Sequence, residues 1–526
     1  MAIKYCDSVN GSDTYDGTAP AFVSGTTGPK QTLGAMVTLM GSAAAGDEFL
    51  LKYGGIWRDA TELTVSGRIG TAGNRITLGA YGTRTDGLPS IRAVLLWDSG
   101  WTDGGHPDVN VWKHACTGGA SFVYVWVDGI AYNQITWNTD AATTFGDPAT
   151  ANSFSVNAAA NELYIVRTTT DPDVDPAAIE VSKPSASLTY PVRWLNCGYW
   201  NFNDLEWRGG QGGLLYIENT TAATLFDEIV VDRCRMDRFS GIGIRIEGAD
   251  VTSRQTLTVR DSVFQDVHPL STSDTIHCLN AGGATAGHVL MIERNRFLRV
   301  GHGIRTGATG NWCSGTIRRN FFYDCEDDCI YADVHALPGG SSLNIYSNIM
   351  LHCGDDGIEF VGATNVHCWN NTIIDSSDIG LHLDGTDASC SSKNNLVANS
   401  RRGFNEIGSN NDAEYTAGVV VDYNLYYNDA GYRFDIGGVI YTTFATYQGD
   451  VAGLDPAGLA TNPLFVTLTP KEAGDVRLQA NSPARAAGVA VGLTEDFFGT
   501  PIPQGAAPSI GAVEYTATRN FAAACT

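Results

Sequence analysis

The chain has 526 residues, of which 43% are hydrophobic and 17% are charged, so it can form a large core and lacks the composition of a disordered chain. At roughly 100–200 residues per domain, this length allows about two to four domains. The 33 basic and 57 acidic residues give a net charge of −24, which excludes nucleic acid and an anionic membrane surface as expected partners, because both require a basic face.

Residues 1–94 predict an N-terminal cap followed by the first coils of a β structure. Met1–Asp7 has neither a basic start nor an apolar stretch, so we expect no signal peptide. No segment approaches the roughly 20 continuous apolar residues of a membrane-spanning helix. Pro29–Met40 predicts a short amphipathic helix that covers the open end of the sheets, and Gly46–Gly55 predicts a turn into a strand.

Residues 95–190 predict a small antiparallel β subdomain inserted between early coils. The segment is rich in tryptophan, contains hairpin-like strands such as Asn161–Val166, and has a stiff turn at Asp171–Pro176. Two interpretations of its tryptophans stay open. They form a carbohydrate-binding face, or they form the core of a small β domain.

Residues 191–430 contain a repeat that predicts a parallel β-helix. Each repeat has a short β-branched strand, an asparagine, a polar turn and a Gly-Ile pair followed by another strand. The asparagines recur every 23 to 29 residues as Asn295, Asn320, Asn348, Asn371, Asn395 and Asn424, with Cys234 and Ser262 in this position earlier. This period, with short strands and no helix, suits one coil of a β-helix, because stacked coils share a core that one coil cannot bury.

The asparagines are expected to stack at one turn and to form a ladder of side-chain amides along the helix axis. A leucine-rich repeat is the alternative for this period, but its L-x-x-L-x-L spacing is absent. Residues 431–526, where the strand pattern thins, predict C-terminal coils or a cap. The predicted fold class is therefore all-β, a parallel β-helix with an N-terminal helical cap and an inserted antiparallel β subdomain.

The twelve cysteines include no C-x-x-C pair, so zinc-finger and thioredoxin-like sites are unsupported. Most of them are expected to be small buried side chains of the core. Cys6 and Cys525 lie near the two ends of the chain, and we expect these two to be the most exposed.

Acidic residues recur at one turn of the repeat, just before the Gly-Ile pair. The residues seven positions after an asparagine are Asp327, Asp355, Asp378 and Arg402. Asp328 directly follows Asp327, and Asp356 directly follows Asp355. Because neighbouring coils lie about 4.8 Å apart, we expect these side chains to form two short ladders. Beside them we expect substrate-binding side chains, namely His302, Arg305, Tyr331, Glu359, Asp378 and His382.

Carboxylates about 5 Å apart raise one another's pKa, so that one acts as a general acid while another stays ionised. Asp355 and Asp356 are the expected catalytic pair, with Asp327 and Asp328 as partners. In retaining glycosidases the two catalytic carboxyl groups are roughly 5–5.5 Å apart, which matches carboxylates on neighbouring coils. Carboxylates two coils apart would be separated by about 9.6 Å, near the upper limit for inverting glycosidases, so the stereochemistry of the reaction stays open. Two further interpretations stay open: the aspartates only satisfy turn N–H groups, or they bind calcium.

Segments at both ends of the chain resemble right-handed parallel β-helix proteins of the pectate-lyase-like superfamily. The resembling segments are Tyr5–Asp13, Gly46–Asp47, Tyr53–Gly55, Asn462–Phe465, Leu478–Ala484 and Ser509–Tyr515. The resemblance covers most of the chain outside residues 95–190 and implies a right-handed helix. It does not define the activity, because the superfamily includes polysaccharide lyases, glycoside hydrolases, epimerases, phage tailspikes and adhesins.

Gly301–Gly303 is similar to the Gly-His-Gly of polygalacturonase-type hydrolases, and Asp355 with Asp356 is similar to their Asp pair. Here the histidine precedes the Asp pairs and no Arg-x-Lys partner is evident, so the roles known in that family are not transferred.

An acidic, glycine-rich β-helix without a visible signal peptide looks most like a phage tailspike or another virion appendage. This resemblance implies a homotrimer, attached to other virion proteins, that binds host surface polysaccharide and in many cases cleaves it as a glycoside hydrolase. The implied location is the virion, after synthesis in the host cytoplasm. The alternatives are a non-enzymatic structural or adhesive appendage and a secreted polysaccharide lyase, in which Arg305 or Arg402 acts beside an acidic sugar with calcium. Apart from calcium, no cofactor is expected.

Overall fold

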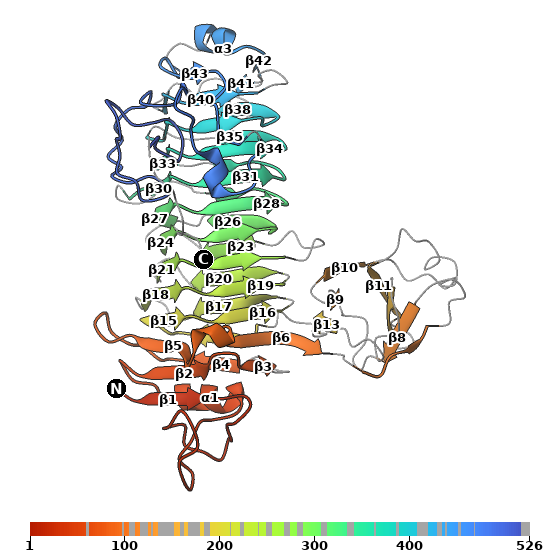
Figure 1. The fold of residues 1–526 in the computed structure, drawn as a ribbon. Helices are drawn as coiled ribbons and strands as arrows, with labels where there is room; N and C mark the ends of the chain where they lie inside the picture. Colours follow the sequence, from red (N-terminus) through yellow and green to blue (C-terminus); the bar gives the residue numbers. More distant parts are fainter. Residues whose placement is uncertain are drawn as a thin grey trace.

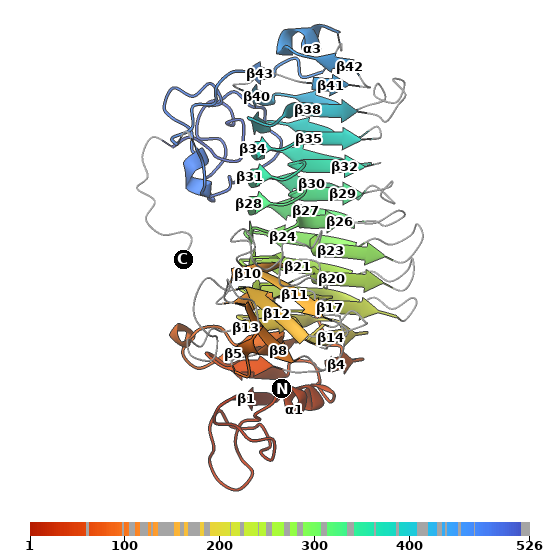
Figure 2. The ribbon, with the colours of Figure 1, turned by 90° about the vertical axis from the view of Figure 1, so that its right-hand side faces the viewer.

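The computed structural model of the chain is a long parallel β-helix in which three sheets run along the axis (Figures 1 and 2). It describes residues 1–516 except for 59–62, 97–98, 105–110, 116–124, 128–129, 135–151, 158–161, 167–178, 183–189, 211, 221–225, 240, 249–254, 268–273, 281–287, 307–312, 334–340, 362–363, 385–388, 408–418, 429–433, 437–438, 451–453 and 468.

Each coil contributes one strand to each sheet, in the order first, second, third. The first sheet contains β1 (Ile3–Cys6), β2 (Glu48–Lys52), β5 (Ile76–Tyr81), β15 (Trp200–Asn203), β18 (Phe226–Asp232), β21 (Gln255–Arg260), β24 (His288–Glu293), β27 (Cys313–Arg318), β30 (Leu343–Tyr346), β33 (Val366–Trp369), β36 (Ser391–Lys393) and β39 (Val420–Asp422). The second contains β3 (Ile56–Arg58), β6 (Ser90–Leu96), β16 (Glu206–Gly209), β19 (Arg235–Asp237), β22 (Val263–Gln265), β25 (Arg296–Leu298), β28 (Phe321–Cys325), β31 (Ile349–Cys353), β34 (Thr372–Ser376), β37 (Leu396–Ala398), β40 (Leu425–Tyr427) and β43 (Leu459–Ala460). The third contains β4 (Leu63–Ser66), β14 (Val192–Leu195), β17 (Gly213–Asn219), β20 (Ile242–Gly248), β23 (Asp274–Asn280), β26 (His302–Thr306), β29 (Ile330–Asp333), β32 (Ile358–Val361), β35 (Ile379–Asp384), β38 (Arg402–Ile407), β41 (Phe434–Ile436) and β42 (Val439–Tyr441).

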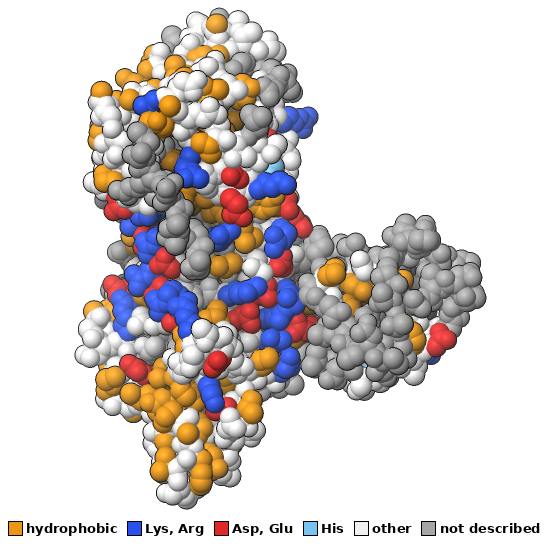
Figure 3. Space-filling view, viewed as in Figure 1, with side chains coloured by type: hydrophobic (Ala, Val, Ile, Leu, Met, Phe, Trp, Pro, Cys, Tyr) orange, Lys and Arg blue, Asp and Glu red, His pale blue; other side chains and the backbone are white. Residues whose placement is uncertain are grey.

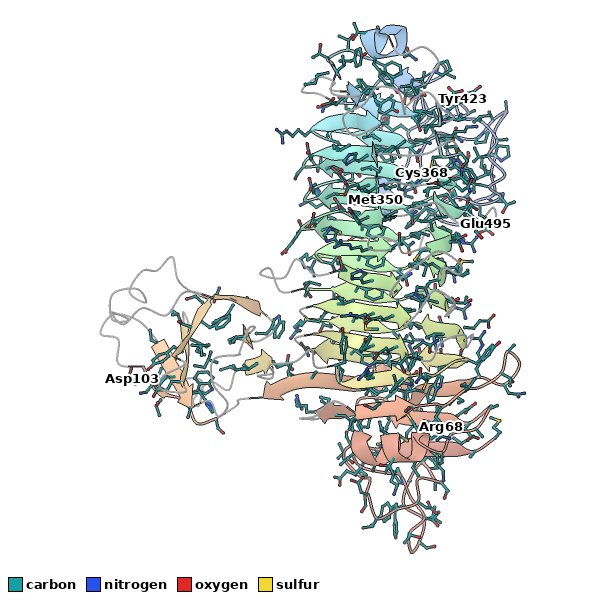
Figure 4. The ribbon with its side chains drawn as sticks, turned by 180° about the vertical axis from the view of Figure 1, so that it is seen from behind. Arg68, Asp103, Met350, Cys368, Tyr423 and Glu495 are labelled. Carbon is teal, nitrogen blue, oxygen red and sulfur yellow. The ribbon has the colours of Figure 1, made fainter. Side chains whose placement is uncertain are left out.

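Apolar side chains of like shape stack from coil to coil inside the helix. The ring of Phe297 lies parallel to those of Phe264 and Phe322, with centroids 4.9 and 4.6 Å away. Met350 and Cys368, which Figure 4 labels among the coils, are fully buried. Stacking identical positions gives every coil the same interior shape, so the continuous core follows directly from the repeat.

The predicted asparagine ladder is confirmed at the turn between the first and second sheets. The backbone N–H and the Nδ2 of Asn320 each donate to Oδ1 of Asn348 at 3.0 Å, and Nδ2 also donates to the carbonyl of Ile292 at 2.9 Å. The same contacts run from Asn295 to Asn424. Arg319, directly before Asn320, has a φ of 56°. This left-handed conformation is unfavourable for an L-residue, and the ladder holds it in place.

Asp455 ends this ladder, and it gives a prediction for stability. Its Oδ1 and Oδ2 accept from the N–H and Nδ2 of Asn424 at 3.1 and 3.2 Å, and burial raises its pKa from 3.8 to about 7. Because the folded pKa is raised, the stability that protonation provides is complete below about pH 4 and is lost as the pH rises through about 7.

We expect Asp455→Asn to continue the amide ladder without a charge and to be more stable than the wild type at pH 8, by up to about 4 kcal/mol. The advantage should shrink as the pH falls toward 4. Thermal unfolding of both proteins at pH 5 and pH 8 measures this. If the melting temperatures of the variant and the wild type differed by the same amount at pH 5 and at pH 8, Asp455 would be ionised in the native protein at both pH values.

Helices cover both ends of the β-helix (Figure 1). The predicted N-terminal helix is α1 (Leu33–Met40), whose Thr32 hydroxyl accepts from the N–H of Ala35 and whose Leu33, Met36, Val37 and Met40 enter the core. At the other end, α3 (Phe444–Asp450) places Tyr447 on the ring of Phe434, with centroids 4.5 Å apart. The described residues contain no helix long and apolar enough to span a membrane.

The segment after β43 forms more than an end cap. It folds back along the second sheet (Figure 2), where the N–H of Ala512 donates to Thr372 Oγ1 at 2.9 Å and Asn394 Nδ2 donates to the carbonyl of Val489 at 2.7 Å. A second apolar core joins Val476, Leu478, Ala484, Ile510, Ala512 and Val513 to outward residues of β28, β31, β34, β37 and β40. The predicted cap at residues 431–526 therefore includes a strap that covers one flank.

The inserted β subdomain projects from the side of the early coils (Figure 1). Its strands are β7 (Thr102–Asp103), β8 (Val111–Ala115), β9 (Val125–Val127), β10 (Ile130–Gln134), β11 (Ser153–Asn157), β12 (Glu162–Val166) and β13 (Ile179–Ser182), and most pairs are antiparallel. Trp101 and Trp126 are buried, which favours the core interpretation for these two tryptophans. Trp97 and Trp137 lie outside the described residues.

The described cysteines are all buried, as predicted for most of them. The expected exposure of Cys6 is wrong. Cys6 ends β1 and faces the interior, where its thiol donates to the carbonyl of Thr32 at 3.6 Å. Cys525 lies outside the described residues.

Ion pairs link turns of neighbouring coils. Arg294 bonds Asp261 at 2.8 Å, and Arg299 bonds Asp266 at 2.7 Å. Figure 3 shows the resulting mixture of basic and acidic side chains over the middle coils. Because positive and negative groups are interspersed on this face, the arginines do not form the continuous basic surface that nucleic acid requires.

Candidate functional site

The predicted polar residues lie at the turn between the second and third sheets and along the third-sheet strands β26, β29, β32 and β35. Arg305, Tyr331, Glu359 and His382 are in register on these four strands. Alternation along a strand turns them outward, since their neighbours Ile304, Ile330, Ile358 and Leu381 are buried. The structure therefore places the four side chains in one row across four coils.

His302 opens the site and contacts the first Asp pair. Its Nε2 lies 3.4 Å from Asp327 Oδ2 and 3.5 Å from Asp328 Oδ2. Burial lowers the pKa of His302, but the hydrogen bond to Asp328 and the charges of Asp327 and Asp274 raise it more, so its pKa is above the usual value. Burial and the Asp328 charge raise the pKa of Asp327, partly offset by His302.

The second ladder, Asp328 and Asp356, is buried, with 3% and 4% of each residue exposed. Asp328 Oδ1 accepts from the N–H of Asp356 at 2.9 Å, and Asp356 Oδ1 accepts from the N–H of Ile379 at 2.8 Å. These contacts run from coil to coil. The open interpretation that aspartates satisfy turn N–H groups therefore describes this pair well.

Glu359 contacts the second ladder from its position on β32. Its carboxyl hydrogen-bonds that of Asp328, and burial together with the Asp328 charge raises the pKa of Glu359 to about 8, partly offset by His382. His382 Nδ1 lies 2.7 Å from Asp356 Oδ2 and 3.3 Å from Glu359 Oε1. Burial also raises the pKa of Asp356, partly offset by His382. The contact with Asp328 therefore favours the protonated form of the Glu359 carboxyl.

Asp355 and Asp378 form the outer ladder. Their carboxylate oxygens and one of Asp356 lie within 4.8 Å of one another. Burial, followed by the charges of Asp356 and Asp328, raises the pKa of Asp355 to about 6. Asp355 is exposed to solvent, and it is largely ionised at neutral pH. The turn and strand of one coil thus carry Asp355, whose pKa is about 6, and four residues later Glu359, whose pKa is about 8.

The structure adds two residues that the repeat alignment missed as site members, Asp274 and His277. Asp274 is in register with His302, its Oδ2 lies 2.6 Å from His277 Nδ1, and its Oδ1 lies 3.7 Å from Arg305. Burial raises the pKa of Asp274, but the hydrogen bond from His277 and the nearby positive charges lower it by more. The pKa of Asp274 is therefore below its usual value, and Asp274 is ionised. The side chain of Arg402 lies outside the described residues.

Three groups among the described residues have ligand atoms within 4.8 Å of one another, namely His302 with Asp327 and Asp328, Asp356 with Glu359 and His382, and Asp355 with Asp356 and Asp378. The last is an all-oxygen set of the kind that calcium prefers. The other two include an imidazole nitrogen, which suits zinc or another transition metal better.

Comparisons with known proteins identify the fold. A family model described as a right-handed β-helix region matches residues 285–419. The solved complex of XylC with xylose is 11% identical, with 98% of each chain covered and a TM-score of 0.53. A structure named as a glycoside hydrolase is 11% identical over 87% of this chain and 99% of its own, with a TM-score of 0.50. No curated protein matches the sequence.

The crystal structure of pectate lyase Pel9A is 14% identical over 98% of each chain, with a TM-score of 0.45. The prediction of an all-β, right-handed parallel β-helix is confirmed. At these identities the solved structures show the shared fold and no more.

Proposed function

We propose that the protein binds a polysaccharide along the third sheet and hydrolyses it between the turns that carry Asp327 and Asp355 and the residue Glu359 on β32. One observation carries this proposal, namely that the coil of β32 carries both the exposed carboxyl of Asp355 at its turn and, four residues later, the outward carboxyl of Glu359, which hydrogen-bonds Asp328 and whose pKa is raised to about 8 by burial and the Asp328 charge. Glycosidases need this combination of a carboxylic acid and a carboxylate around the glycosidic oxygen. The structural neighbour named as a glycoside hydrolase supports the proposal at the level of the fold.

Each site residue has a role in this proposal. Glu359 is the general acid, and either Asp355 or Asp327 is the second carboxylate, acting as nucleophile or as base toward water. Asp328 and Asp356 hold Glu359 and His382 in place through the contacts described above. This assignment moves the acid from the predicted Asp pairs to Glu359, because Asp328 and Asp356 are buried and already bonded to backbone N–H groups.

The remaining side chains recognise the sugar. The guanidinium of Arg305 lies 4.9 Å from the centre of the Tyr331 ring, and the two present a cationic and aromatic surface beside the acid. Such a surface suits sugars that carry hydroxyl and carboxylate groups. His302 lies one coil before Asp327, and Asp378 lies one coil after Asp355, so these two side chains mark the two ends of the site along the helix axis.

The finer proposal is a phage tailspike, a virion appendage that attaches to host surface polysaccharide and degrades it. The elongated shape in Figure 2 and the net charge of −24 support a protein that works outside the cell on a polymer. A homotrimer attached to other virion proteins belongs to this proposal. A non-enzymatic appendage differs from it by binding the polymer without shortening it.

The pH dependence of kcat/KM gives a direct prediction. With Asp355 as the second carboxylate, activity requires Asp355 ionised and Glu359 protonated, so it should rise as the pH passes about 6 and fall as the pH passes about 8. Initial rates from pH 4.5 to 9.5 on one polysaccharide measure this profile. A rate that stays constant above pH 8.5 would show that the proton does not come from Glu359.

Product analysis separates hydrolysis from lyase chemistry. Arg305 beside a carboxylate cluster is also the arrangement that a β-elimination lyase would use on a uronic acid with calcium. We expect reducing ends without new ultraviolet absorbance, since hydrolysis adds water and forms no double bond. Unsaturated uronate products that disappear when EDTA is added would instead identify a lyase.

A further inference from the structure

Three cysteines meet inside the β-helix directly beneath the candidate site. Cys325 ends β28, Cys353 ends β31 on the next coil in register with it, and Cys329 immediately precedes β29. All three are buried, with 3% or less of each residue exposed. Cys329 hydrogen-bonds the thiol of Cys325, and its Sγ lies 2.7 Å from Sγ of Cys353.

The position of Cys329 belongs to the Gly-Ile pair of the repeat, and this position is crowded. A Cβ added to Gly303, one coil earlier, would lie 2.5 Å from the carbonyl oxygen of Cys329 and 2.6 Å from the Phe322 ring. A Cβ added to Gly357, one coil later, would lie 2.4 Å from Ile373. This lack of space explains why Gly303 and Gly357 are glycines. Cys329, at the same position of the coil between them, carries a side chain.

The contact between Cys329 and Cys353 is shorter than a non-bonded contact. Non-bonded heavy atoms settle at about 3.5–4.0 Å, whereas a disulfide bond is about 2.05 Å long. A separation of 2.7 Å lies between these two distances. The two free thiols therefore lie close enough for a small approach of the sulfurs to bring them to bonding distance.

We propose that Cys329 and Cys353 form a disulfide bond that links neighbouring coils under the Asp327–Asp328 and Asp355–Asp356 turns. The oxidant is a small disulfide such as oxidised glutathione. The thiolate of one cysteine attacks it and releases one thiol, and the thiolate of the other cysteine then displaces the second. The two cysteines lose two protons and two electrons in total, and the oxidant leaves as two thiols. The bond forms while the coils are assembling, because the folded core excludes the oxidant.

Peptide mapping tests this proposal. The full chain is produced in an oxidising compartment and, separately, in a reducing cytosol, and thiols are alkylated in denaturant at acid pH. No Lys or Arg lies between Arg319 and Lys393, so trypsin leaves all three cysteines on one peptide. A protease that cleaves at Asp and Glu separates them, because Glu326 lies between Cys325 and Cys329, and Asp333 lies between Cys329 and Cys353.

The expected result from the oxidising compartment is a linked pair of peptides holding Cys329 and Cys353, about 2 Da lighter than the two thiol peptides together. Cys197 and Cys234, whose thiols contact backbone carbonyls, are matched controls and should be alkylated in both preparations. Alkylation of both Cys329 and Cys353 in that preparation would overturn the proposal, and so would a link between Cys325 and Cys329.

A thermal measurement provides an independent readout. Adding a reductant should lower the melting temperature of the oxidised wild type and leave that of Cys353→Ser unchanged. If Cys353→Ser does not fold, the wild type alone with and without reductant gives the comparison. An identical melting temperature of the wild type under both conditions, with full reduction shown by alkylation, would contradict a bond that stabilises the coils.

Discussion

Glu359→Gln is expected to lower kcat by about 10²–10⁴-fold while polysaccharide binding changes less than about threefold. Glutamine has nearly the same shape and keeps a hydrogen bond to Asp328, but it cannot donate a proton to the glycosidic oxygen. The raised pKa of Glu359 is the property that the substitution removes. Rates on the cleaved polysaccharide, together with binding of the same polymer to the inactive variant, measure the two effects separately.

The matched control is Glu247→Gln, which also lies on an outward position of the third sheet. Glu247 pairs with Arg245 at 2.8 Å and accepts from the Tyr216 hydroxyl at 2.6 Å, two contacts outside the proposed machinery. Its kcat should stay within about twofold of the wild type. Equal activity of Glu359→Gln and Glu247→Gln would remove Glu359 from the mechanism.

Asn348→Ala is expected to destabilise the protein by about 3–5 kcal/mol, the largest stability effect we predict. Alanine removes the acceptor for both nitrogens of Asn320 and the donor to the Ile317 carbonyl and to Asn371. Asn348 is fully buried, so water cannot replace these partners. Thermal unfolding and urea unfolding measure the loss.

The control for the ladder is Asn462→Ala. Asn462 is exposed and accepts one hydrogen bond, from the N–H of Leu464 at 2.8 Å. Losing it should reduce stability by about 1 kcal/mol or less. If Asn348→Ala were no more destabilising than this control, the amide ladder would not be a main source of cohesion between coils.

The repeating part of the fold was predictable because one physical constraint acts on each coil. Residues that stack in register must satisfy the same turn and fill the same interior, so Asn348 and its equivalents recur at a nearly fixed spacing. The same spacing placed Arg305, Tyr331, Glu359 and His382 on one row. The strap after β43 was not predictable in this way. Its contacts with β34 and β37 are made by side chains that do not recur at a fixed spacing in the sequence.

The site was predictable as a row of residues but not as a set of protonation states. Asp355 and Asp356 are adjacent in sequence, yet one is exposed and the other buried, and only the coil geometry distinguishes them. Asp274 escaped the alignment because its coil has Ser262 in the asparagine position, and Asp274 follows Ser262 by 12 positions and not by seven. The pairing of Glu359 with Asp328 joins two neighbouring coils at different positions of the repeat and leaves no pattern in the sequence.

Reducing-end release from a panel of bacterial surface polysaccharides tests the central claim most directly. The wild type is compared at pH 7 with the double variant Asp327→Asn/Asp355→Asn, whose two substitutions remove both carboxylates proposed to act with Glu359. We predict that the wild type releases reducing ends from at least one polymer and that the double variant binds this polymer without releasing them. Equal release by both proteins would place the chemistry elsewhere in the chain, and binding without release by the wild type would show a protein that recognises the polymer but does not cleave it.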